Sequence, residues 1–347
     1  MPTHIDVLVG DYESCVRWSI AAIKADKKAM IAYPQTNNQF SFYFGYSVHD
    51  YDMLIYGCIL GAMEKIAMEV AKELNSMLSE DFFKRNPAMT MYLESHVAMD
   101  IHILVRFGRW RDILLLKFPK DSELMLYRSA SLYFARALAY ANLGGIDQAK
   151  EEAKCYEKLR ANPEAKNRIL HNNTVSDLLN VDSAMMKGEI AYFAGNHEYA
   201  FEQLRRGIEL QDGLNYDEPW GKMQPIRHAL GGLMLKQGLV DEAEEVFRAD
   251  LKIHPRNPWA LTGLIGCLKQ QLRVQGSVND DSNTENVCCS SQQKQLAQKS
   301  KTKSLTGAQR DQKLAEMNEL QIQLEKQRKS EWADYNVTHA CACCCLD

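Results

Sequence analysis

A few histidine and aspartate side chains near the N-terminal end of the sequence could bind a metal ion. His49 and Asp52 are three positions apart, so on a helix they share one face. Together with His4 they offer the nitrogen and oxygen ligands that divalent transition metals accept. The alternative interpretation is that these polar side chains line a groove or cap a helix.

Two further histidines, His96 and His102, accompany Asp100 in a second polar group. Their spacing on a helix puts His102 off the face that His96 and Asp100 share. We therefore expect this second group to be structural.

Cysteines crowd the end of the sequence, where Cys341, Cys343, Cys344 and Cys345 lie within the last seven positions. Thiolates this close together could share a soft metal ion such as Zn²⁺ or Cu⁺. Lipidation is a second possibility, although the terminal Asp347 departs from the usual last residue of a prenylation signal. A third is a reduced tail that is flexible or packs as a small apolar plug.

A loop at 211–225 is the best candidate for binding a partner. It contains Tyr216, Asp217, Glu218 and Trp220, which place an acidic pair beside large aromatic side chains. This combination could receive a basic or amphipathic peptide. The same loop could instead brace two neighbouring helical pairs, since tryptophan and proline pack well as wedges.

Composition excludes several function classes. The chain has 347 residues, of which 46% are hydrophobic and 25% charged, and its net charge is −4. That charge argues against nucleic acid as the main partner, because phosphate binding requires a basic surface. The sequence has no transmembrane stretch, no secretory signal and no nucleotide or other cofactor motif. Isolated cysteines without a signal favour a cytoplasmic location.

The clearest element pattern lies at 225–258, where two amphipathic helices meet at Gly238. The second helix carries Val240, Ala243 and Phe247 on one apolar stripe, as expected of a helix packed on one side. Glycine and alanine positions allow the two helices to approach closely. The pattern matches the 34-residue tetratricopeptide (TPR) repeat.

Weaker copies of this pattern recur along the chain, so we expect an all-α solenoid of antiparallel helix pairs. The turn glycines of these pairs are Gly10, Gly61, Gly108, Gly144, Gly195 and Gly238. Their spacing is irregular, which predicts long loops or long helices between some of the pairs.

The sequence predicts four segments. Residues 1–271 form the TPR-like solenoid, and 272–308 are polar, poor in apolar residues and expected to be disordered. Residues 309–335 form a helix that completes the last repeat, and 336–347 are the cysteine-rich tail. The short apolar stripe of that helix favours packing on 258–270 over an independent coiled coil.

Five separated motifs resemble a family of uncharacterised TPR proteins from bacteria, algae and fungi. They are MPTHID at the start, RFGRW at 106–110, YDEPW at 216–220, the segment from Asn257 to Leu261, and the ending from Ala333 to Cys343. The resemblance implies an all-helical solenoid and no particular reaction. It also implies that the chain is truncated at its N-terminus, because members continue upstream of MPTHID. Where the family has H-x-x-H, this sequence has His49 and Asp52.

We therefore expect a protein- or peptide-binding scaffold that uses the concave face of the solenoid and has no catalytic residues. The alternative is a metal-binding protein or metal-dependent enzyme with His4, His49 and Asp52, or Cys341 and Cys343, as ligands. The sequence does not identify a partner.

Overall fold

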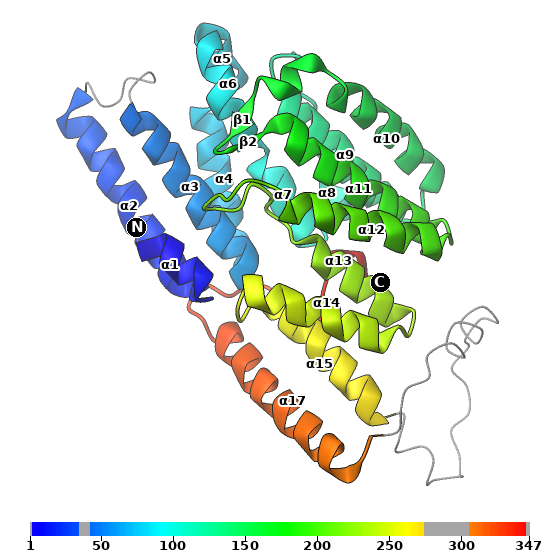
Figure 1. The fold of residues 1–347 in the computed structure, drawn as a ribbon. Coiled ribbons are helices and arrows are strands. Elements are labelled where there is room, and N and C mark those ends of the chain that lie inside the picture. The colour runs from blue at the N-terminus through cyan, green and yellow to red at the C-terminus, as the bar shows by residue number, and fades with distance from the viewer. Residues whose placement is uncertain (1, 35–41, 274–304, 345–347) are drawn as a thin grey trace. The chain divides into compact units, whose positions relative to one another are not determined.

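The chain is mostly helical in the computed structural model, which confirms the all-α class (Figure 1). The ranges that the structure describes are 2–34, 42–273 and 305–344. The predicted polar segment 272–308 falls largely outside these ranges, so its expected disorder lies outside the described residues. In the described part of the chain, no helix combines the length and the apolar character needed to cross a bilayer.

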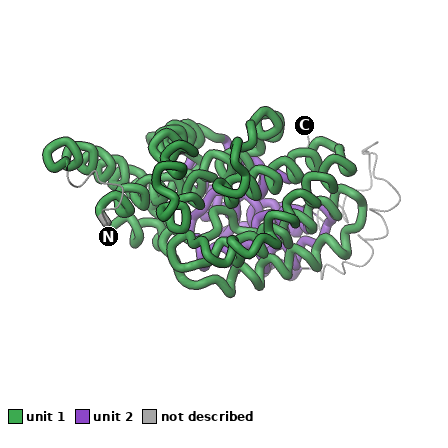
Figure 2. The backbone as a smooth tube through the Cα atoms, turned by 90° about the horizontal axis from the view of Figure 1, so that it is seen from above, with its two compact units in different colours: residues 1–226, 331–335 green, residues 227–330, 336–347 purple. Residues whose placement is uncertain are grey.

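The chain divides into two compact units, which Figure 2 colours separately. Unit 1 comprises residues 1–226 with 331–335, and unit 2 comprises 227–330 with 336–347. The segment boundaries expected at 271, 308 and 335 stay a prediction.

Unit 1 contains helices, short 3₁₀ turns and a small hairpin. Its elements are α1 (Pro2–Leu8), α2 (Tyr12–Ala32), α3 (Phe42–Gly61), α4 (Glu64–Met77), α5 (Glu80–Arg85), η2 (Pro87–Met89), α6 (Thr90–Leu93), η3 (Glu94–Ala98), α7 (Met99–Arg106), α8 (Trp110–Leu115), α9 (Leu126–Asn142), α10 (Ile146–Arg160), η4 (Pro163–Lys166), β1 (Ile169–Leu170), β2 (Asn173–Thr174), α11 (Val175–Phe193) and α12 (His197–Asp212). Strands β1 and β2 pair antiparallel, and at two residues each they are too short to give an alternating sequence pattern.

Consecutive helices of unit 1 pack as pairs, notably α9 with α10 and α11 with α12 (Figure 1). The pairs turn at Gly144 and Gly195, whose φ angles of 84° and 85° lie in the left-handed region that favours glycine. Five of the six predicted turn glycines adopt such a φ. The exception is Gly61, which ends α3, and Ala62 takes the left-handed conformation with φ 60°.

Asp334 caps helix α4 from the far end of the sequence. The residue at the N-cap position, Met63, makes no side-chain hydrogen bond to the first turn. Instead, Oδ1 of Asp334 accepts from the backbone N–H of Glu64 at 2.6 Å, and Oδ2 accepts from that of Lys65 at 3.0 Å. A carboxylate here satisfies two orphan donors and complements the helix dipole.

We expect Asp334→Ala to lower the free energy of unfolding by about 1 kcal/mol, the usual cost of losing a cap. Urea denaturation followed by circular dichroism measures this difference. Asp334→Asn is the matched control and should lose less, because its amide oxygen can still accept one of the two bonds. Equal stability of the alanine variant and the wild type would contradict the capping role.

The described residues of unit 2 form four longer helices and a short 3₁₀ turn. Its elements are α13 (Ile226–Lys236), α14 (Val240–Ile253), α15 (Pro258–Arg273), α17 (Gly307–Arg328) and η6 (Ala342–Cys344). Phe247 of α14 is fully buried. Its ring lies against Gly231 of α13 and Gly263 of α15, where an added Cβ would come within 2.7 and 2.3 Å of Phe247 Cζ. The two glycines therefore let three helices close around one aromatic ring.

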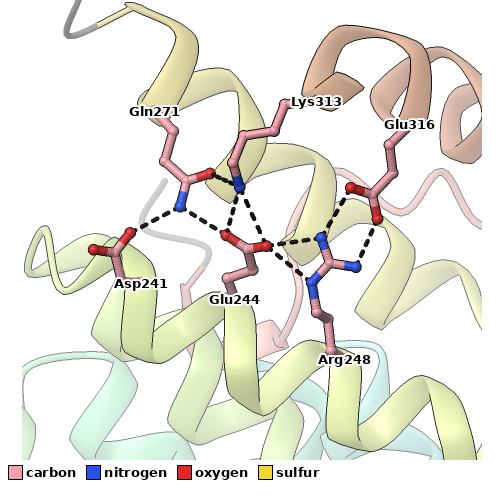
Figure 3. A network of polar contacts seen from close by, with 6 residues as sticks. All are labelled: Asp241, Glu244, Arg248, Gln271, Lys313 and Glu316. Atoms are coloured by element: carbon pink, nitrogen blue, oxygen red, sulfur yellow. Dashed lines mark hydrogen bonds and ion pairs between the residues drawn. The ribbon is translucent and has the colours of Figure 1, made fainter. Parts of the chain in front are cut away.

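A network of charges ties α17 to the rest of unit 2 (Figure 3). Glu244 of α14 accepts hydrogen bonds from Gln271 Nε2 at 2.7 Å and Lys313 Nζ at 3.2 Å. Arg248 donates two hydrogen bonds to Glu316, at 2.6 and 2.9 Å. Burial would raise the pKa of Glu244, but the hydrogen bonds from Gln271 and Arg248 and the charge of Lys313 outweigh it and lower that pKa. The network fixes the position of α17 on α14 and α15.

Candidate metal centre

Ionisable side chains from five parts of unit 1 converge in a group that we call the histidine cluster. Its members are His4 of α1, His49 and Asp52 of α3, His96 of η3, His171 between β1 and β2, and Glu218 in the loop after α12.

Helix α3 forms the centre of this cluster. His49 and Asp52 lie one turn apart on it and so point to the same side. Helix α1 packs against α2 and α3, which brings His4 to His49. The rings of these two histidines meet edge to face with their centroids 5.2 Å apart.

The β1–β2 hairpin places His171 beside His49 and His96. Next to His96, the hydroxyl of Ser95 donates a hydrogen bond of 2.8 Å to the carbonyl of Ile169 and so fastens the hairpin to η3. His171 has a φ of 50°, as expected in the two-residue loop that joins β1 to β2. Its ring centroid lies 5.2 Å from that of His96 and 5.4 Å from that of His49.

Asp52 is completely buried and lies between two imidazoles. Nδ1 of His96 hydrogen-bonds its Oδ2, and Nε2 of His171 lies 3.6 Å from the same oxygen, which is too far for a hydrogen bond. Among the described residues, neither Oδ1 of Asp52 nor Nε2 of His171 has a hydrogen-bond partner. Buried polar atoms are nearly always satisfied, so these two atoms are the places in the cluster where a further group, such as water or an ion, can bind.

The donor atoms of this trio are close enough to share an ion. One ring nitrogen each of His96 and His171 and one oxygen of Asp52 lie within 4.8 Å of one another. Two ligands about 2.1 Å from one ion lie up to about 4.2 Å apart. Small side-chain rotations would therefore bring all three donors into range.

His4 and His49 form the other half of the cluster. Their Nε2 atoms are 3.1 Å apart, and Nδ1 of His4 lies 2.6 Å from Oε2 of Glu218. The hydroxyl of Tyr216 donates to the other oxygen of Glu218. A carboxylate that accepts from one ring nitrogen fixes the tautomer and turns the lone pair of the other nitrogen outward.

The pKa values of the cluster are shifted in different directions. Burial and repulsion from His171 lower the pKa of His49 to about 4, so its imidazole is neutral at pH 7. Burial would raise the pKa of Asp52, but the attraction of His96 and a contribution from His171 prevail and lower it to about 2. Metal ligands must be deprotonated, and His49 and Asp52 meet that condition. Burial would lower the pKa of His171, but Asp52 beside it prevails and raises that pKa, so an ion bound there would displace a proton from His171.

A second His–Asp–His group, in unit 2, shows what a satisfied core network looks like. Oδ2 of buried Asp250 bonds with His228 Nε2 at 2.7 Å and accepts from Asn257 Nδ2 at 3.0 Å. Its Oδ1 bonds with His254 Nδ1 at 3.1 Å. Both oxygens of Asp250 are thus occupied, in contrast to those of Asp52.

The structure brings together the predicted metal ligands His4, His49 and Asp52. It also places His96 in contact with Asp52, and the structural role expected for His96 stays a prediction. The other members of that polar group lie elsewhere. Asp100 forms an ion pair with Arg128 at 2.7 Å, and His102 is buried 3.4 Å from the hydroxyl of Tyr127.

His171 and the role of Glu218 as a partner of His4 are not anticipated by the sequence. His171 follows two strand residues and precedes two asparagines, and no ligand spacing marks it. The only available signal is its place in a short turn between helices.

The predicted ligands Cys341 and Cys343 belong to unit 2 and so to a different compact unit from the histidine cluster. Their sulfur atoms are 2.7 Å apart, and Sγ of Cys344 lies 4.0 Å from that of Cys343. Burial raises the pKa of Cys343 well above its ordinary value, and its contacts with Cys341 and Cys344 raise it further. Cys345 lies outside the described residues. Soft-metal binding by this tail stays a prediction.

The predicted binding loop packs against the hairpin. Asp217 is buried and accepts hydrogen bonds from Asn172 N at 3.0 Å and from Asn173 Nδ2 at 2.5 Å. Tyr216 and Trp220 meet edge to face with ring centroids 5.6 Å apart. These contacts favour a bracing role for Asp217, while Glu218 turns to His4. Binding of a peptide by this loop stays a prediction.

Comparison with models of protein families and with curated proteins finds no match to the sequence.

Proposed function

We propose that this protein binds a divalent transition-metal ion through Asp52, His96 and His171. The observation that supports the proposal is the fully buried carboxylate of Asp52, which faces two imidazoles and keeps one oxygen unsatisfied among the described residues. A buried carboxylate in this state is costly unless a cation completes it.

The donor chemistry favours zinc. Two imidazole nitrogens and one carboxylate oxygen are the ligand types of catalytic Zn²⁺ sites, where a water molecule takes the fourth position. Such water is acidified and becomes a nucleophile at neutral pH. Hydrolysis is therefore the reaction that this centre would support if the protein is an enzyme.

Titration of chelator-treated protein with Zn²⁺ in a calorimeter tests the proposal. We expect saturable binding by the wild type. The double variant His96→Ala/His171→Ala should bind at least about 100-fold more weakly, because the loss of an outer-shell partner alone costs about 10–100-fold.

His197→Ala is the matched control. This histidine is also in unit 1, but its ring packs on Tyr192 with centroids 4.7 Å apart, and it should leave binding unchanged. Equal zinc affinity in the double variant and the wild type would refute the proposal.

A second candidate function is the protein- or peptide-binding scaffold. We infer a TPR-like solenoid from the helix pairs that turn at left-handed glycines. A groove of about 370 Å³ on unit 1 supports partner binding. Its apolar wall includes Ile20, Ile23 and Leu54, and Lys24 and Lys28 are among its lining side chains. An amphipathic segment with acidic side chains has the matching chemistry.

A further inference from the structure

The donors of the histidine cluster fall into two groups. Asp52, His96 and His171 already form one compact trio. His4 and His49 form a separate pair whose Nε2 atoms are 3.1 Å apart. The pair adjoins the trio, because the rings of His49 and His171 are in edge-to-face contact with centroids 5.4 Å apart.

We propose that His4 and His49 hold a second divalent transition-metal ion beside the first, so that the centre is dinuclear. This inference rests on the proposed function, since the first ion is the one held by Asp52, His96 and His171. The separation of 3.1 Å between the two Nε2 atoms falls within the limit of about 4.2 Å for two ligands of one ion.

The contacts around His4 support this second position. Glu218 accepts from Nδ1 of His4 at 2.6 Å, so Nε2 of neutral His4 accepts a hydrogen bond from Nε2 of His49 at 3.1 Å. A bound ion would take the place of the proton in this contact. Carboxylate, histidine and metal are commonly arranged in this order, with the carboxylate orienting the ligand. Tyr216 in turn donates to Glu218, so the outer carboxylate is itself held in place.

Each half of the cluster thus has its own carboxylate. Asp52 is itself a proposed ligand of the first ion, whereas Glu218 orients His4, a proposed ligand of the second ion, through a hydrogen bond. Two adjacent ions can bind both the attacking and the leaving oxygen of a displacement, which a single ion with five ligands could not do.

The experiment measures metal per chain and the coupling between ions. Chelator-treated full-length protein is loaded with Zn²⁺, desalted and analysed for zinc, and is separately loaded with Mn²⁺ for electron paramagnetic resonance. We expect two zinc ions per wild-type chain and the spectrum of two coupled Mn²⁺ ions. His4→Ala and His49→Gln should each retain one ion and show an uncoupled spectrum.

Glu218→Gln provides a variant that keeps every proposed ligand. It should weaken only the second ion, by about 10–100-fold, and circular dichroism should show an unchanged helical content. His197→Ala should keep two ions.

The outcomes separate this inference from the proposed function. One ion in the wild type with unchanged affinity in His4→Ala would overturn the second position and leave the first intact. One ion that is lost in His4→Ala would also overturn it, because the cluster would then be a single site. No ion in any variant would overturn the proposed function and the inference together.

Discussion

Replacing Asp52 with asparagine is expected to weaken zinc binding by more than about 100-fold. Asparagine keeps the size of the side chain and one acceptor oxygen, but it removes the negative charge that lies against the proposed ion. Loss of an outer-shell partner already costs about 10–100-fold, and a directly bound carboxylate contributes more. Calorimetric titration of chelator-treated protein with Zn²⁺ measures the difference.

Asp250→Asn is the matched control, since Asp250 is equally buried between two histidines. Both of its oxygens are occupied by protein donors, so zinc affinity should stay unchanged. Stability should fall by about 3–5 kcal/mol, because the partners of a buried charge are left uncompensated. Asp52→Asn should therefore lower zinc affinity, whereas Asp250→Asn should lower stability. A loss of zinc binding in Asp250→Asn alone would contradict the assignment of the centre.

Phe247→Ala should lower the free energy of unfolding by about 3–5 kcal/mol, as large-to-small substitutions in a core do. The ring is fully buried and fills the space left by the two glycines Gly231 and Gly263. Neither glycine has a side chain that can move into the cavity. Thermal and urea denaturation followed by circular dichroism measure the loss.

Phe193→Ala is the comparison for this second prediction, because its side chain at the end of α11 is only partly buried. It should cost clearly less than Phe247→Ala. A shift of less than one degree in the melting temperature of Phe247→Ala would show that the ring is not a core element.

Much of the helical framework can be predicted from the sequence. The apolar stripe of 240–251 predicts α14 and the burial of Phe247, and glycine at 144, 195 and 238 predicts the turns between helices. The turn after α3 differs from this prediction. Gly61 is the predicted turn residue, but Ala62 adopts the left-handed conformation, which a residue with a side chain rarely takes. Local preference favours the neighbouring glycine, but tertiary packing places the turn one residue later.

The histidine cluster could be predicted only in part. His49 and Asp52 share one helix, so their spacing reveals a common face. His96 reaches Asp52 from a 3₁₀ segment, to which the helical spacing argument does not apply. His171 and Glu218 are brought in by a two-residue hairpin and a loop, and neither element has a periodic pattern from which its neighbours could be inferred.

The ligands of the proposed centre come from positions as far apart as His4 and His171, and His4 is in turn hydrogen-bonded to Glu218, 214 residues away in sequence. No short stretch of the nascent polypeptide contains a complete coordination set. The first proposed ion would therefore find its three ligands only once the residues up to His171 have been synthesised and have folded together. An ion bound there would connect α3, η3 and the hairpin. Because it would bind only the folded state, it would stabilise unit 1 against heat and proteolysis.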